Sequence, residues 1–153
     1  MILTNLTKYR DQGLLILRIG IGIMFILHGY SKVFDGPERW EKLGGNMADL
    51  GIDFALKFWG FMAGMAEFGG GILLMLGLFF RPACILMFIT MFVAASHHWI
   101  EAAEAGENLK GKIMEGSHAI EAGILFLTLI FIGPGRFSLD ERIRNPKNSN
   151  TLD

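Results

Sequence analysis

Four long apolar stretches alternate with polar segments along the chain. They run from about Gly13 to Val33, Ala55 to Phe80, Pro82 to Trp99 and Ser117 to Gly133. Each is about 17 to 25 residues long, which is enough for a helix to cross about 30 Å of hydrocarbon. A helix of a soluble bundle needs a polar face, and the second and third stretches have none. The pattern therefore predicts an all-α, integral membrane four-helix bundle, and 153 residues leave room for one domain, 1–153.

The connections predict the topology. With four spans, both ends of the chain lie on the same side as the turn at Arg81, between the second and third spans. That side carries seven lysines and arginines, against six on the other side. The excess predicts that both termini are cytoplasmic. The first stretch is too long for a signal peptide and no small-residue cleavage motif follows it, so we expect a retained span.

Two polar segments carry helix signals of their own. Apolar residues of the first outer loop follow a 3-4-3 spacing (Trp40, Leu43, Met47 and Leu50), which predicts a short amphipathic helix on the outer membrane surface. Ser138 and Glu141 have the spacing of a capping box, which predicts a short cytoplasmic helix after the last span. The polar tail 147–153 has no reason to be ordered alone.

Composition and charge agree with a membrane protein. Apolar residues make up 52% of the chain and charged residues 19%, whereas a soluble domain carries about a quarter charged residues. The net charge of −1 gives no support to nucleic acid as a partner. The one cysteine, Cys84, cannot form an internal disulfide or a Cys-x-x-Cys pair, and we interpret it as a buried structural thiol. We therefore expect the chain to lie in a lipid bilayer.

Ionisable side chains within the spans need a partner or a function, because their burial in lipid is costly. Arg18 lies in the inner third of the first span and Glu67 near the middle of the second. The length of the arginine side chain allows a buried Arg18–Glu67 ion pair, which would fix the register of the two helices. Small residues around Glu67 predict that it faces the interior of the bundle.

Histidines and carboxylates gather in the outer half of the predicted bundle. We identify a candidate interior polar site from His28, Glu67, His97, His98, His118 and Glu121. Such groups could bind a quinone and exchange protons with it. They could also bind a first-row metal, which we favour less because the set names no ion, and we assign no metal ligands. A third alternative is that the histidines lie at the interface without any ligand.

His97 and His98 point about 100° apart on a helix, so we expect one of them to face inward. We favour His98, because it continues the line of Cys84, Met87 and Met91 along one face.

Three segments resemble the DoxX family of small four-span bacterial membrane proteins. They are LLILRIGIGIMFILHGYSKVFD with Arg18, Gly29 and Lys32, MAEFGGGILLMLGLFFRPA with Glu67, Gly77 and Arg81, and the ending GPGRFSLD. The resemblance implies a four-helix bundle in the bacterial inner (plasma) membrane. The family takes its name from a subunit of a thiosulfate:quinone oxidoreductase, and other members are linked to membrane redox or thiol-stress complexes. It assigns no catalytic role to His97, His98, His118 or Glu121.

Two functions remain open at this point. The chain could be a redox subunit that interacts with quinone and with a membrane or soluble oxidoreductase partner, through the histidines and carboxylates of the candidate polar site. It could instead be a non-catalytic accessory subunit, whose glycine faces pack against other subunits of a larger membrane complex or against a second copy of the chain.

Overall fold

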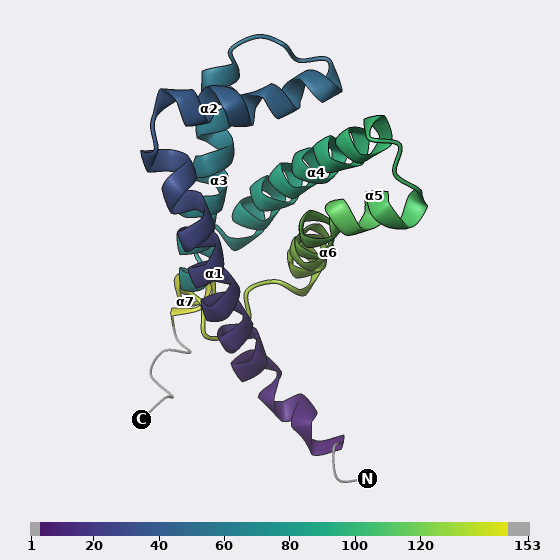
Figure 1. Ribbon diagram of the computed structural model, residues 1–153. Helices are drawn as coiled ribbons and strands as arrows, with labels where there is room; N and C mark the ends of the chain where they lie inside the picture. The colour runs from purple at the N-terminus through teal and green to yellow at the C-terminus, as the bar shows by residue number, and fades with distance from the viewer. Residues whose placement is uncertain (1–3, 147–153) are drawn as a thin grey trace.

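A computed structural model describes residues 4–146 of the chain, which contain helices and no strand (Figure 1). The polar tail 147–153, which has no reason in its sequence to be ordered alone, lies outside the described residues. The elements are η1 (Thr4–Tyr9), α1 (Arg10–Phe34), α2 (Pro37–Gly44), η2 (Gly45–Leu50), α3 (Leu56–Leu76), α4 (Phe80–Glu104), α5 (Leu109–Glu115), α6 (Ser117–Ile132) and α7 (Leu139–Arg144). The predicted all-α helical bundle is confirmed.

Each predicted span corresponds to one helix, with different ends. Helices α1, α3 and α4 are long and apolar enough to cross a membrane. The fourth span is different, because α6 has 16 residues, which correspond to about 24 Å of helix. Only together with α5 is it long and apolar enough to cross a membrane, and the chain bends by 66° between the two helices.

The helices pack as two pairs, α1 with α3 and α4 with α6, and α3 also packs on α4. Close approach in the first pair depends on glycine. A Cβ on Gly29 would lie 2.3 Å from the backbone nitrogen of Phe68, and one on Gly22 would lie 2.8 Å from the carbonyl oxygen of Gly71. In the second pair, Met87 and Met91 of α4 and Phe126 of α6 belong to one buried apolar cluster, together with Cys84. The predicted burial of Cys84 is confirmed.

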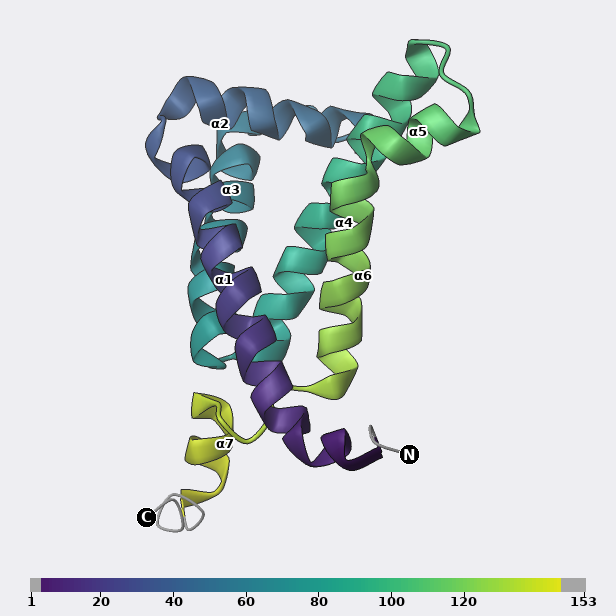
Figure 2. The ribbon, with the colours of Figure 1, turned by 60° about the horizontal axis from the view of Figure 1, so that its bottom comes forward.

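Helix α2 lies across the end of the bundle at which α1 ends and α3 begins (Figure 2). The Trp40 indole donates a hydrogen bond to the Val33 carbonyl oxygen at 3.1 Å, which ties α2 to the end of α1. The structure thus contains the helix predicted from the spacing of Trp40 and Leu43, and η2 continues it. Its position on the outer membrane surface remains a prediction.

The opposite end of the bundle holds the α3–α4 turn, the start of α1 and helix α7 (Figure 2). Ser138 caps α7 by accepting a hydrogen bond from the Glu141 amide, as the capping-box spacing predicts. Asp140 accepts hydrogen bonds from the amides of Phe79 and Phe80, both at 2.9 Å, and so caps α4. Helix α7 is therefore attached to the α3–α4 turn, and both ends of the described chain lie at the same end of the bundle.

Candidate functional site

Glu67 is buried in α3, as predicted, with 2% of its surface exposed. Its partner is Lys32 of α1, whose Nζ lies 2.6 Å from Oε1 and 2.7 Å from Oε2. The prediction of an Arg18–Glu67 ion pair is wrong. A carboxylate that accepts from an ammonium group through both oxygens has its charge balanced inside the bundle.

The register of α1 against α3 explains the correction. The two helices are antiparallel, with Gly29 beside Phe68 and Gly22 beside Gly71. In that register Arg18 lies opposite Gly77, ten residues and about 15 Å along α3 from Glu67. Neither side chain can bridge this distance, whereas Lys32 is within reach of Glu67.

Arg18 is buried with 1% of its surface exposed and serves a different contact. Its guanidinium donates a hydrogen bond to the carbonyl oxygen of Phe137, in the segment that leads into α7. A Cβ on Gly77 would lie 2.0 Å from Nη1 of Arg18, so only glycine leaves room for this side chain. Arg18 therefore fastens the C-terminal segment to the bundle.

His97 and His98 lie near the end of α4, and neither is buried. His97 Nδ1 is 2.7 Å from a carboxylate oxygen of Asp49 in η2, and His98 Nδ1 is 3.8 Å from Glu101. The His98 side chain is 42% exposed and that of His97 33%, so the expectation that His98 faces the interior is not met. The His97–Asp49 contact ties η2 to α4.

His28 of α1 and His118 of α6 do come together. Their ring centroids are 5.7 Å apart, and both residues are exposed at the surface of the bundle. One turn deeper, Phe25 packs edge-on against Phe126 with centroids 4.9 Å apart. We call the place where these rings join the two helices the α1–α6 seam.

Glu121 lies one turn from His118 on α6 and is exposed. Among the described residues it makes no hydrogen bond or ion pair, unlike Glu67, Asp49 and Glu141. An unpaired carboxylate within an apolar helix is unusual and marks a candidate for function. Of the six predicted site residues, the structure therefore brings His28 and His118 together, with Glu121 one turn along α6 from His118. It places Glu67, His97 and His98 elsewhere.

Within residues 4–146, no group of three or more His, Cys, Asp or Glu side chains could hold a metal ion. The metal alternative therefore has no ligand set in this part of the chain.

Two partners were missed by the sequence reasoning. The sequence pattern did not indicate Lys32 as a partner of Glu67, although it lies one turn after Gly29 on α1. Gly29 contacts α3, and the spacing of Lys32 from Gly29 puts both residues on the same face of α1. This spacing is the signal that could have indicated Lys32 as the partner of Glu67. Asp49 had no comparable signal, because only the fold brings η2 to α4.

Comparison with known proteins supplies the family. The DoxX family model matches residues 13–99. An uncharacterized protein of Haemophilus influenzae is 38% identical, with 92% of this chain and 97% of that protein covered. The inner membrane protein YphA of Escherichia coli is 34% identical, with 90% and 99% covered, and the inner membrane protein YqjF of the same organism is 28% identical, with 92% and 98% covered. No solved structure matches the chain. The chain is a membrane protein with several apolar helices, and it belongs to the DoxX family.

Proposed function

We propose that this chain is an inner-membrane redox subunit that binds a quinone head group at the α1–α6 seam. The observation that carries the proposal is the contact of His28 with His118, whose ring centroids are 5.7 Å apart and which are both exposed. The unpaired Glu121 lies one turn from His118 on α6. Two relatives are named inner membrane proteins, which supports the location.

The groups at the seam fit a quinone. An imidazole can donate a hydrogen bond to a carbonyl oxygen and can change its protonation near neutral pH. His28 and His118 would donate hydrogen bonds to the carbonyl oxygens of the ring, and Glu121 would take up and release protons one turn from His118. A bound quinone supplies the two-electron chemistry, and an oxidoreductase partner provides the electrons. The exposed position of both histidines leaves the head group accessible from the lipid phase, in which quinones dissolve.

The test is the quinone content of the purified full chain. We expect the wild-type protein to retain quinone through purification in mild detergent, measured by solvent extraction and absorbance. His28→Phe and His118→Phe keep an aromatic ring but remove the nitrogens, so each should lower the quinone content about tenfold, since a lost hydrogen bond costs about 1.5 kcal/mol. His98→Phe, on α4 and outside the seam, is the matched control. A wild-type protein without quinone, or equal loss in all three variants, would contradict the proposal.

A second candidate, a non-catalytic accessory subunit, is favoured by one observation. The glycines of α3 that were predicted as a packing face are covered within the chain by α1, α2 and α4. Gly13 and Gly20 of α1, in contrast, are exposed and have no atom within 4 Å of a Cβ position. Such small residues let a neighbouring helix approach closely. Gly13→Leu with Gly20→Leu should then reduce the size of the complex extracted in mild detergent while leaving the quinone content unchanged.

A further inference from the structure

A hollow of about 490 Å³ opens at the end of the bundle that holds α7, and none of the residues of the α1–α6 seam lines it. It lies between the start of α1, the α3–α4 turn and the segment from α6 to α7. Four arginines contribute to its lining: Arg10, Arg81, Arg136 and Arg144. Three acidic side chains do so as well, namely Asp11, Asp140 and Glu141.

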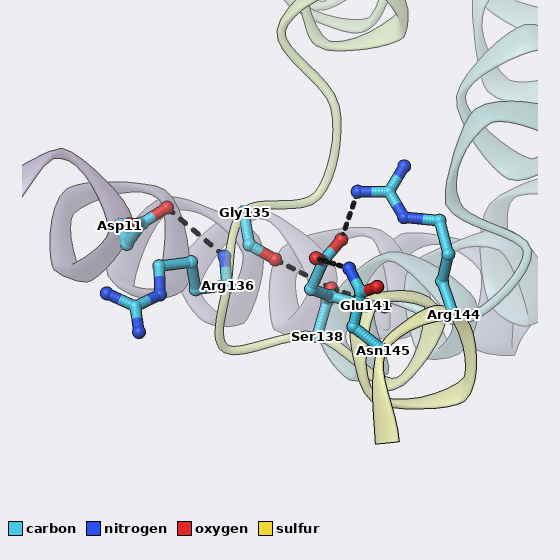
Figure 3. A network of polar contacts seen from close by, with 7 residues as sticks. All are labelled: Asp11, Gly135, Arg136, Ser138, Glu141, Arg144 and Asn145. Atoms are coloured by element: carbon cyan, nitrogen blue, oxygen red, sulfur yellow. Dashed lines mark hydrogen bonds and ion pairs between the residues drawn. The ribbon is translucent and has the colours of Figure 1, made fainter. Parts of the chain in front are cut away.

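The acidic side chains are already occupied. Asp140 accepts from two amides of the α3–α4 turn. Asp11 accepts from the amide of Arg136 at 3.1 Å (Figure 3). Glu141 forms an ion pair with Arg144 and also accepts from the side chain of Asn145. The hydrogen bonds of these carboxylates therefore hold the wall of the hollow together.

The arginines keep most of their donors free. In the described part of the chain, the guanidinium groups of Arg10 and Arg136 make no hydrogen bond or ion pair. Arg81 uses only Nε, which donates to the Ile130 carbonyl oxygen at 3.0 Å. In Figure 3 the Arg136 guanidinium extends away from the Glu141–Arg144 pair. A guanidinium has five donors in a planar fork that matches phosphate oxygens, so the free donors fit a phosphate group.

The surroundings of the hollow indicate where that phosphate comes from. The lining also includes Phe79, which is 65% exposed, and Ile132, which is 41% exposed. Helices α3 and α6 end here and α4 begins, so the hollow lies where apolar helix surface meets water. Basic pockets of this kind between membrane helices bind the head groups of anionic lipids, whose acyl chains can cover the neighbouring apolar side chains.

We propose that this hollow binds the phosphate head group of an anionic phospholipid through Arg10, Arg81 and Arg136, with the acyl chains against Phe79 and Ile132. The bound lipid would cover the junction of α1, α6 and α7.

The experiment titrates the full chain, purified in a neutral detergent, with phosphatidylglycerol, phosphatidylcholine or inorganic phosphate, and counts bound lipids by native mass spectrometry. The variant is Arg10→Gln with Arg136→Gln, which removes two guanidinium groups that make no hydrogen bond or ion pair within the described residues. Arg142→Gln is the matched control, because Arg142 lies on α7 at the same end but does not line the hollow. Each arginine contributes roughly a factor of five to the binding of an anionic lipid, so the double variant should bind phosphatidylglycerol about thirtyfold more weakly.

We expect the wild-type chain and Arg142→Gln to bind phosphatidylglycerol in preference to phosphatidylcholine, and the double variant to lose this preference. Three results would overturn the proposal: equal binding of both lipids by the wild-type chain, an equal loss in Arg142→Gln, or displacement of the lipid by inorganic phosphate, which would identify a free anion as the occupant. If the double variant fails to fold, Arg136→Gln alone, in an exposed loop, should weaken binding about fivefold.

Discussion

Glu67 illustrates how one buried acid is made compatible with an apolar bundle. Both of its carboxylate oxygens accept from the Lys32 ammonium, and the lysine side chain remains 26% exposed at the end of α1. The pair thus balances charge inside the bundle while the lysine keeps part of its hydration. A buried pair of this kind contributes less to stability than to fixing one register of two helices.

Breaking this pair should be more costly than removing it. We expect Glu67→Gln and Lys32→Met to lower the free energy of unfolding in detergent by about 2 kcal/mol each, below the ~3–5 kcal/mol of a fully buried pair because Lys32 is partly hydrated. The double variant should lose clearly less than the sum of the two. Lys57→Met, which removes an exposed contact to Glu41 at 3.4 Å, is the control and should change little. Additive losses at Glu67 and Lys32 would contradict the coupling.

The partners of single residues could be predicted only in part. Helical periodicity indicated that Glu67 faces the interior, because the face of a residue follows from its position in the turn. Periodicity carries no information about how far one helix is shifted along another. The axial shift of α1 against α3 follows from the contact of Gly29 with the Phe68 backbone, and this shift sends Arg18 to Phe137 instead of Glu67.

At the scale of the helix pair, the glycines of α1 have two different roles. Gly29 lies against the backbone of α3, whereas Gly20 on the same helix has nothing within 4 Å of a Cβ position. Alanine at position 29 must push the two helices apart, and backbone atoms cannot yield in the way that a flexible side chain can.

We therefore expect Gly29→Ala to lower the free energy of unfolding by about 3 kcal/mol, as overpacked sites do. Gly20→Ala adds the same methyl group without a contact and should be neutral or stabilising by up to about 1 kcal/mol, because alanine favours the helix. Thermal unfolding of the two variants in the same detergent measures the difference. Equal effects would mean that α1 and α3 are not in close contact at Gly29.

The apolar pattern predicted the number and order of the long helices but not their ends. Helix α4 continues to Glu104, beyond the predicted end at Trp99, because a helix keeps its hydrogen bonds where its side chains become polar. The bend between α5 and α6 was not predicted either. Gly116 lies at that bend and is buried beside Ala95 and His98, a tertiary contact that local sequence does not reveal.

For the whole molecule, the structure places both ends of the described chain at the end of the bundle that holds the α3–α4 turn, as the prediction of four spans implies (Figure 2). Which side of the membrane this end faces is a separate question, on which the count of seven basic residues against six gives a prediction. The α1–α6 seam lies toward the other end. Orientation would therefore decide which leaflet presents the proposed lipid to the arginine-lined hollow, and from which side protons would reach Glu121 in the proposed quinone site.

We predict that the end with α7 is cytoplasmic. Cysteine labelling tests this, with the wild-type chain as the background control. Asn145→Cys and Glu104→Cys both place a thiol at an exposed position, and neither changes the count of lysines and arginines. The native Cys84 is fully buried and should not react, so the wild-type chain sets the background. In intact cells, an impermeant maleimide should label Glu104→Cys only, and Asn145→Cys should react only after the membrane is opened. The reverse pattern would place Arg10 and Arg136 on the outer side, and the histidine pair of the seam would then exchange protons with the cytoplasm.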